Sequence, residues 1–255
     1  NHSSRISLCF IIAHKLIFTS FESPFFCPLN ISFSLIFWYN YSIKDLEVFM
    51  LDFSTMIYRI PALLFAITIH EYAHALCADS MGDSTPRRMG RLTFNPMAHL
   101  DVIGALLLVV VGFGWAKPVA INQNNFRNRK EGVIKVSLAG PASNLFACFL
   151  AAFMAALLNK FGMMGDGMYK FLLWMQLYNV WFAFFNLLPI PPLDGSKLVS
   201  EMLPPYQAWK FENFVGQYGM YILFGLVLTG AMGWILNPLA RMYLLLVNSI
   251  IGIVF

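Results

Sequence analysis

Long apolar segments separated by short polar ones dominate the pattern of this chain. Residues 56–78 are almost continuously apolar and, as a helix rising 1.5 Å per residue, are long enough to cross a hydrocarbon layer of about 30 Å. Two further apolar segments cover residues 136–158, interrupted by Gly140 and Pro141, and residues 170–193. This pattern predicts an all-α polytopic membrane protein.

The other apolar segments are shorter or broken. Residues 102–113 would form a helix of only about 18 Å, and nearby glycines favour a re-entrant hairpin over a crossing. Residues 215–231 predict a further span and residues 239–255 a last apolar helix, with Gly233 and Pro238 separating them. In total we expect about five transmembrane helices plus a short re-entrant hairpin.

Composition and charge support a membrane protein. Only 12% of the 255 residues are charged, against about 25% in soluble domains. Apolar segments bracket both basic clusters, so we expect no nucleic-acid partner, and the positive-inside rule places both clusters on the cytoplasmic side. These clusters are Arg87, Arg88 and Arg91, followed by Lys117, Arg127, Arg129, Lys130 and Lys135.

The first apolar segment contains the motif His70-Glu71-Tyr72-Ala73-His74. Residues four apart share one face of a helix, so His70 and His74 can direct two imidazoles at one Zn²⁺. Glu71 lies beside them and can accept a proton from a metal-bound water. Ionisable groups inside a bilayer each cost about 2.5–3.5 kcal/mol, which favours a metal site over a chance occurrence of the motif.

A catalytic zinc needs a third protein ligand, and Asp194 is the best candidate. It follows Pro189, Pro191 and Pro192, through which a helix cannot continue, so the backbone must unwind just before it. If the spans alternate in direction, Asp194 and the two histidines meet near the cytoplasmic face. The alternative is that Asp194 only forms a turn before Gly195.

Other polar residues in apolar surroundings have two interpretations each. Asn144 can hydrogen-bond a substrate or a developing oxyanion, or can bond between helices. Asn186 is similar but is more typical of a structural residue. His99 is either an extra ligand or, as we favour, an interfacial histidine. Lys117 is expected to anchor the re-entrant hairpin at the interface.

Residues 1–49 differ from the rest. They are rich in Phe, Ser and Ile, carry no cleavage site of the signal-peptide type, and precede Met50. We expect either an added arm or, preferably, sequence upstream of the true start at Met50, and assign the domain to residues 50–255.

From about Met50 to its end, the chain resembles the site-2 protease family of intramembrane zinc metalloproteases, in particular the compact prokaryotic branch without a PDZ domain. The resemblance rests on four motifs in the family's order, which are more specific than HExxH alone. These motifs are His70-Glu-Tyr-Ala-His74, Gly112-Phe-Gly-Trp-Ala-Lys-Pro118, Gly140-Pro-Ala-Ser-Asn144 and Asn186-Leu-Leu-Pro-Ile-Pro-Pro-Leu-Asp-Gly195.

The resemblance implies that His70, His74 and Asp194 hold one Zn²⁺ per chain. It also implies that Glu71 is the general base and that Asn144 lies near the scissile bond. The implied substrate is a membrane protein with a transmembrane helix, cleaved in the bilayer of a prokaryotic cell membrane with the active site toward the cytoplasm. Residues 102–111 would present an edge to unwound substrate. Neither the resemblance nor the sequence indicates an oligomeric state.

Two other functions fit the same ligands. A membrane metal transporter would use them for passage, but transporters place such sites between repeats, and the sequence has no repeat. A transporter also has no need of Glu71 directly after the first ligand. A catalytically silent metal-binding membrane protein is the other alternative, and the presence of all four expected residues, His70, Glu71, His74 and Asp194, argues against it.

Overall fold

The computed structural model describes residues 53–101 and 117–254, and these residues form helices and no strand. Eight α-helices and one 3-10 turn, η1 (Gln123–Asn125), are present in them. The α-helices are α3 (Phe53–Ser80), α4 (Thr85–Arg88), α5 (Pro96–His99), α7 (Arg129–Lys160), α8 (Asp166–Asn186), α9 (Asp194–Met202), α10 (Pro205–Leu228) and α11 (Ala231–Val254).

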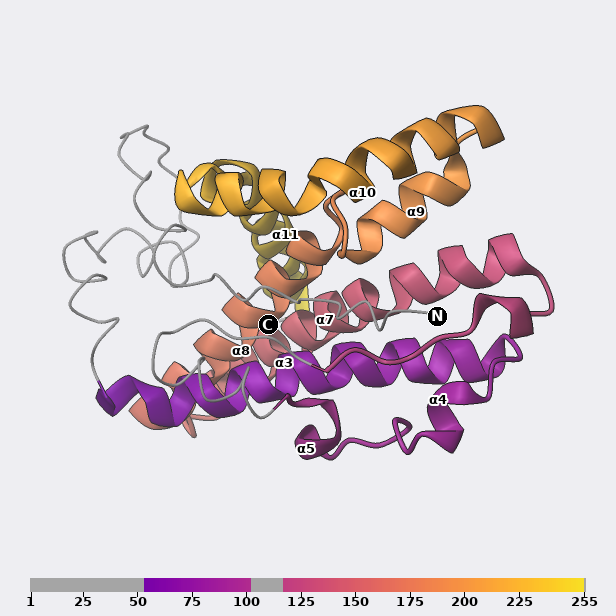
Figure 1. The fold of residues 1–255 in the computed structure, drawn as a ribbon. Helices are drawn as coiled ribbons and strands as arrows, with labels where there is room; N and C mark the ends of the chain where they lie inside the picture. Colours follow the sequence, from indigo (N-terminus) through magenta and orange to yellow (C-terminus); the bar gives the residue numbers. More distant parts are fainter. Residues whose placement is uncertain (1–52, 102–116, 255) are drawn as a thin grey trace.

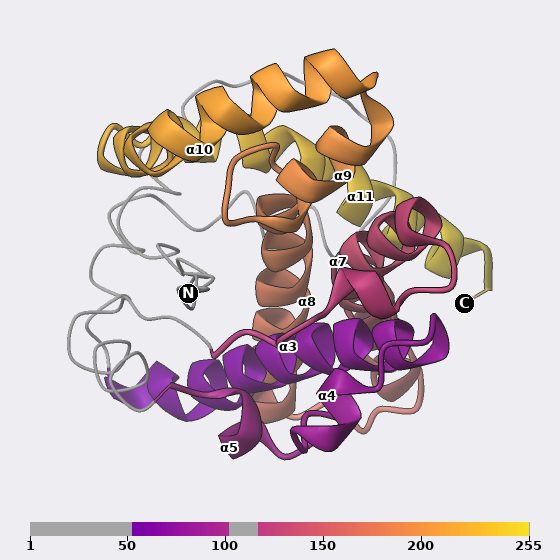
Figure 2. The ribbon, with the colours of Figure 1, turned by 45° about the vertical axis from the view of Figure 1, so that its right-hand side comes forward.

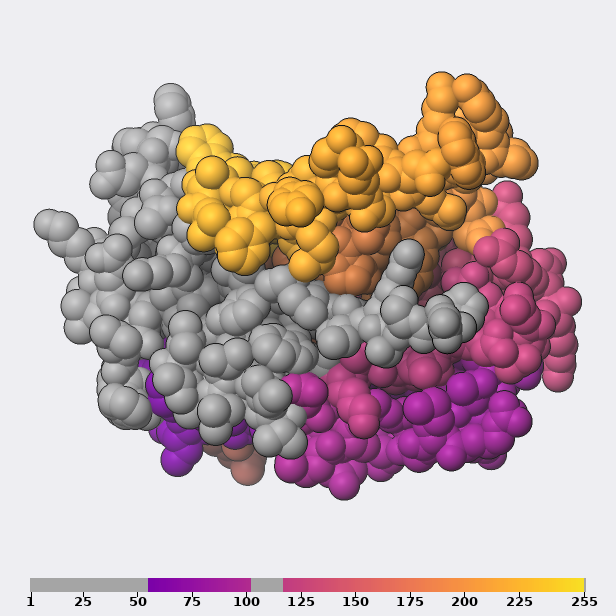
Figure 3. Space-filling model, in the orientation of Figure 1, coloured from indigo at the N-terminus to yellow at the C-terminus, as the bar shows by residue number. Residues whose placement is uncertain are grey.

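Helices α3, α7 and α8 pack against one another and form the centre of the molecule (Figures 1 and 2). Helix α9 packs on α7, whereas α10 contacts α9 and α11 (Figure 1). The space-filling view shows α10 along the upper edge of one face and the segment after α3 along the lower edge (Figure 3).

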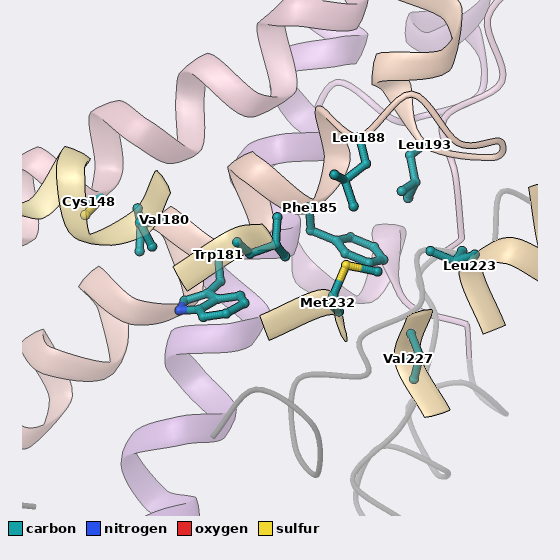
Figure 4. Close-up of a cluster of buried hydrophobic side chains, with 11 residues drawn as sticks. Cys148, Val180, Trp181, Phe185, Leu188, Leu193, Leu223, Val227 and Met232 are labelled. Atoms are coloured by element: carbon teal, nitrogen blue, oxygen red, sulfur yellow. The ribbon is translucent and has the colours of Figure 1, made fainter. Parts of the chain in front are cut away.

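Two buried apolar clusters hold these helices together. The first lies between α3, α7 and α8. It includes Ala62 and Ala66 of α3, which are fully buried, and small residues at such positions let helices approach closely. The second cluster joins α8 to α7, α10 and α11 (Figure 4). Its labelled members are Cys148, Val180, Trp181, Phe185, Leu188, Leu193, Leu223, Val227 and Met232.

Three described helices are long and apolar enough to cross a membrane: Thr55–Ser80, Arg129–Lys160 and Ala231–Val254. The all-α fold and the first span are therefore as predicted. The helix predicted at residues 170–193 is present as α8, although it is not among these three candidates. The expected re-entrant element at residues 102–113 lies outside the described residues.

The predicted interruption at Gly140 and Pro141 is wrong, because α7 runs through both. A proline costs a helical hydrogen bond, but inside a membrane an intact helix satisfies the other backbone groups. Here the Ser143 hydroxyl donates to the Gly140 carbonyl at 2.7 Å and reaches the Ile69 carbonyl of α3 at 3.3 Å. Helix α7 also begins before the apolar segment 136–158, at Arg129, where the Asn128 side chain caps it.

The break expected at Gly233 and Pro238 is also misplaced. Helix α10 ends at Leu228, and Gly230, with φ of 74°, makes the turn into α11. Glycine is favoured there because a side chain strains this left-handed conformation. Pro238 is instead accommodated within α11.

The predicted unwinding before Asp194 is confirmed. Helix α8 ends at Asn186, and the chain passes through the proline run without helix until α9 begins at Asp194. A Cβ on Gly195 would lie 2.1 Å from the Leu187 carbonyl oxygen. Glycine is therefore required for this close approach, which turns the chain back and directs Asp194 toward α3.

Candidate metal centre and active site

His70 and His74 lie one helical turn apart on α3, and both are buried, with 1% and 6% of their surface exposed. Their outer ring nitrogens point toward each other, with His70 Nε2 and His74 Nε2 2.9 Å apart. As predicted from the spacing of the motif, the helix brings one nitrogen of each imidazole to the same point.

The opposite ring nitrogens are fixed by hydrogen bonds. His70 Nδ1 donates to Asn144 Oδ1 on α7 at 2.7 Å, and His74 Nδ1 donates to the Val136 carbonyl at 2.7 Å. The carbonyl can only accept, which sets the tautomer of His74, and the same assignment for His70 follows from the amide orientation described below. With protons on Nδ1, both Nε2 atoms present lone pairs to the centre, as metal-ligating histidines do.

Asp194, at the start of α9, completes a group of three. Its Oδ2 lies 2.9 Å from His74 Nε2 and 3.3 Å from His70 Nε2. Bonds of about 2.0–2.1 Å to a tetrahedral zinc would place the ligand atoms about 3.3 Å apart. Two imidazoles and one carboxylate are a donor set for catalytic zinc, and the ligand atoms lie close enough to hold one ion. The residues therefore fit the metal.

Gly140 leaves the space in which the two imidazoles meet. A Cβ at this position would lie 2.4 Å from His74 Nε2 and 2.7 Å from His70 Nε2. No side chain fits there without moving the ligands. The small residues of α7 thus serve the site directly as well as helix packing.

Lys197 lies one turn after Asp194 on α9, with its Nζ 3.2 Å from Asp194 Oδ1. Burial alone would raise the pKa of Asp194, but the positive charge of Lys197 beside the carboxylate lowers it. The carboxyl group is therefore an anion with one oxygen toward the histidines and the other toward Lys197. Lys197 was not predicted from the sequence, although its i+3 spacing from Asp194 on a helix indicates the pair.

Glu71 is 4% exposed, and its Oε2 accepts a hydrogen bond from the Val119 backbone N–H at 3.0 Å. It borders a cavity of about 30 Å³ next to the three converging ligand atoms. A cavity of this size holds a water molecule rather than a peptide. Its lining residues are His70, Glu71, His74, Pro118, Val119, Ile121, Asn186, Pro192, Asp194 and Lys197.

Asn144 is fully buried, and its side chain is committed to other protein groups. Its Nδ2 donates to the Ala66 carbonyl at 2.9 Å and to Asn179 Oδ1 at 2.8 Å, while its Oδ1 accepts from His70. Asn179 Nδ2 in turn donates to the Met175 carbonyl. These bonds set the orientation of the Asn144 amide, so that oxygen rather than nitrogen faces His70.

The other residues singled out from the sequence lie in different places. Asn186 lines the cavity and donates to the Phe182 carbonyl. His99 is fully buried in α5, where its Nε2 donates to the Thr93 carbonyl, and it is not part of the His70, His74 and Asp194 group. The Lys117 backbone N–H donates to the His99 carbonyl at 2.8 Å.

Comparison with known proteins agrees with this geometry. The sequence model of peptidase family M50 matches residues 159–230, which include Asp194 but not the histidine motif. "Putative zinc metalloprotease YwhC" of Bacillus subtilis is 38% identical over 192 residues, which cover 73% of this chain and 87% of that protein. The chain belongs to peptidase family M50.

Two more distant relatives have similar names. "Putative zinc metalloprotease Rip2" of Mycolicibacterium smegmatis is 28% identical over 66% of this chain and 66% of its own length. "Putative zinc metalloprotease MJ0611" of Methanocaldococcus jannaschii is 31% identical over 38% of this chain and 49% of its own length. No solved structure matches the chain.

Membership of the M50 family makes this chain a zinc metalloprotease of the site-2 type. It is an enzyme, which disfavours the metal transporter and the catalytically silent protein as its function. The zinc requirement of such an enzyme and the donor set of His70, His74 and Asp194 agree.

Proposed function

We propose that this M50 peptidase hydrolyses peptide bonds in or near transmembrane segments of membrane proteins. The observation that carries the proposal is the position of the site. Three potential zinc ligands and Glu71 converge on one small cavity, and three of these four residues belong to the apolar helix Thr55–Ser80. A soluble protease would have no reason to place such a site in a membrane-spanning helix, where each ionisable group is costly.

In this proposal His70, His74 and Asp194 hold one zinc ion and Glu71 is the general base. When bound, zinc would polarise the scissile carbonyl as a Lewis acid and lower the pKa of the attacking water. Glu71 borders the same cavity, accepts the proton of the attacking water and returns it to the leaving amine. Because Glu71 Oε2 accepts a hydrogen bond from the Val119 N–H, we assign Oε1 as the oxygen that accepts the proton of the attacking water.

We assign Asn144 to the orientation of His70 rather than to the oxyanion. Both of its N–H groups donate to protein acceptors, and its carbonyl oxygen holds His70 Nδ1. It would have to break one of these bonds to reach a substrate. Partners of this kind fix the ligand's ring and tautomer.

We further propose a chain of about five transmembrane helices with a re-entrant hairpin, in a prokaryotic cell membrane. The site opens toward the cytoplasm. In support, α3 ends and α7 begins at the same end of the molecule, and α4, with Arg87 and Arg88, and the start of α7, with Arg129 and Lys130, lie there (Figure 1). The Arg127 N–H donates to the Met81 carbonyl across this end.

The substrate helix must unwind before cleavage, because its carbonyl groups are otherwise hydrogen-bonded. The test is cleavage of a transmembrane peptide reconstituted with the enzyme in lipid vesicles, with the scissile bond located by mass spectrometry. We expect cleavage within the apolar segment or close to its end. Cleavage only of a water-soluble control peptide would contradict an intramembrane activity.

A further inference from the structure

A segment without helical structure, residues 117–122, runs alongside α3 and borders the active-site cavity (Figure 1). We call this segment the strap. Pro118, Val119 and Ile121 line the cavity, and the Val119 N–H is the hydrogen-bond donor to Glu71 Oε2. The strap therefore touches the proposed general base directly.

One end of the strap is held by Asp83, which is fully buried. Its Oδ2 accepts from the Asn122 backbone N–H at 2.7 Å, and its Oδ1 accepts from Asn125 Nδ2 at 2.8 Å. The backbone N–H of Thr85 also donates to Oδ1, at 3.1 Å. A buried carboxylate needs such partners, so these bonds tie the strap to the turn that follows α3.

The other end of the strap is held by the segment around Arg91, which is 4% exposed. Arg91 Nη1 donates to the Lys117 carbonyl at 3.1 Å and to the Ala98 carbonyl at 2.5 Å. The Lys117 N–H donates to the His99 carbonyl at 2.8 Å. Both ends of the strap are thus attached to residues 81–99, the segment that follows the helix carrying Glu71.

The turn at Gly82 lets the backbone before Asp83 approach Asn125 closely. Gly82 has φ of 113°, and a Cβ there would lie 2.9 Å from the Asn125 carbonyl oxygen. Phe126 then packs into the cluster with Ala78 at the end of α3. The path from Glu71 through α3, the turn, Asp83 and the strap back to Glu71 is a closed loop of contacts.

We propose that Asp83 is a positioning residue for catalysis, which acts through the strap. By holding Asn122 it keeps the Val119 N–H on Glu71 Oε2, and this bond fixes the orientation in which Glu71 Oε1 faces the cavity. The inference rests on the proposed role of Glu71 as the general base. Asp83 itself does not touch substrate or metal.

The direct test is D83N in the full chain. Asparagine has the same shape but presents an N–H₂ group either to the Asn122 N–H or to the Thr85 N–H, so one attachment is lost. Displacing a catalytic group by about 1 Å can cost about 100-fold in rate. We expect kcat on a transmembrane peptide to fall by about 10- to 100-fold, with KM and zinc content unchanged.

D79N is the matched control. Asp79 lies in the last turn of α3 and pairs with exposed Arg87, and among the described residues no hydrogen bond or ion pair joins this pair to the strap. We expect wild-type kcat, because exposed ion pairs contribute little.

A second, milder pair of variants covers the case that D83N does not fold. N125A removes one hydrogen bond to Asp83 at an exposed position, and N124A, at the exposed neighbouring residue, is its control. We expect a smaller loss of kcat in N125A only.

Amide hydrogen exchange reports on the strap itself. We expect faster exchange at Val119 and Asn122 in D83N or N125A, with the amides of residues 62–78 unchanged. Faster exchange with wild-type kcat, or unchanged exchange in both variants, would overturn the inference. Glu71→Gln is measured beside them: turnover in that variant would refute the proposed function, whereas an inactive Glu71→Gln with fully active D83N refutes only the role of Asp83.

Discussion

At the scale of single residues, Gly140 is the position where the metal centre tolerates no side chain. Alanine is the better helix former by about 0.5–1 kcal/mol, yet its Cβ would collide with both imidazoles. We expect Gly140→Ala to lower zinc content and abolish cleavage, with helix content retained. Zinc analysis of the purified protein together with circular dichroism measures this.

Gly225→Ala is the matched control for Gly140→Ala. Gly225 also lies within a helix, α10, but a Cβ there meets no atom within 4 Å. This variant is expected to keep both zinc and activity. Full zinc content in Gly140→Ala would show that the imidazoles do not meet at this point.

Asn144→Leu tests whether the buried amide orients His70. Its loss leaves His70 Nδ1 without the acceptor at 2.7 Å, and loss of such a partner typically weakens metal affinity about 10- to 100-fold. We expect weaker zinc binding in a chelator competition assay, with Asn159→Leu at the exposed end of α7 unaffected. Unchanged zinc affinity with a lost kcat would instead assign Asn144 to the substrate.

At the scale of elements, Asp83 links the turn after α3 to the strap and η1. Burial raises its pKa, but hydrogen bonds from Thr85, Asn125 and Asn122 outweigh this and lower the pKa. A depressed pKa contributes stability above the unfolded value of about 3.9, and this contribution is lost as pH falls through the folded pKa.

The wild type should therefore melt above D83N at pH 6, and the difference should shrink below about pH 4. Thermal unfolding of both proteins in detergent over this range measures it. A difference that stays constant down to pH 3 would mean that folding does not lower the pKa of Asp83.

The elements also show what the sequence can and cannot predict. Apolar length predicted α3, and helical periodicity paired His70 with His74, because both are local properties. The proline run predicted the unwound backbone before Asp194. The end of α10 at Leu228 was missed, because glycine and proline mark possible breaks while packing decides between them. The Val119 contact with Glu71 joins residues distant in sequence, and no local pattern encodes it.

At the scale of the whole molecule, the orientation in the membrane is the main consequence. Asn124, beside the strap, and Met163, after the far end of α7, are both exposed and lie at opposite ends of this helix. In a chain whose four native cysteines are replaced, we expect Asn124→Cys to react only with reagents on the cytoplasmic side. Met163→Cys should react from the opposite side, and labelling of both from one side would contradict the proposed orientation.

The central claim is that one zinc ion and Glu71 together hydrolyse peptide bonds at this site. The most direct test measures zinc content and cleavage of a transmembrane peptide for the wild type and Glu71→Gln, prepared in the same detergent. General-base catalysis contributes about 10²- to 10⁴-fold, so we predict one zinc per chain in both proteins and at least about a 100-fold loss of cleavage in the variant. Wild-type turnover by Glu71→Gln, or absence of zinc from the active wild type, would contradict it.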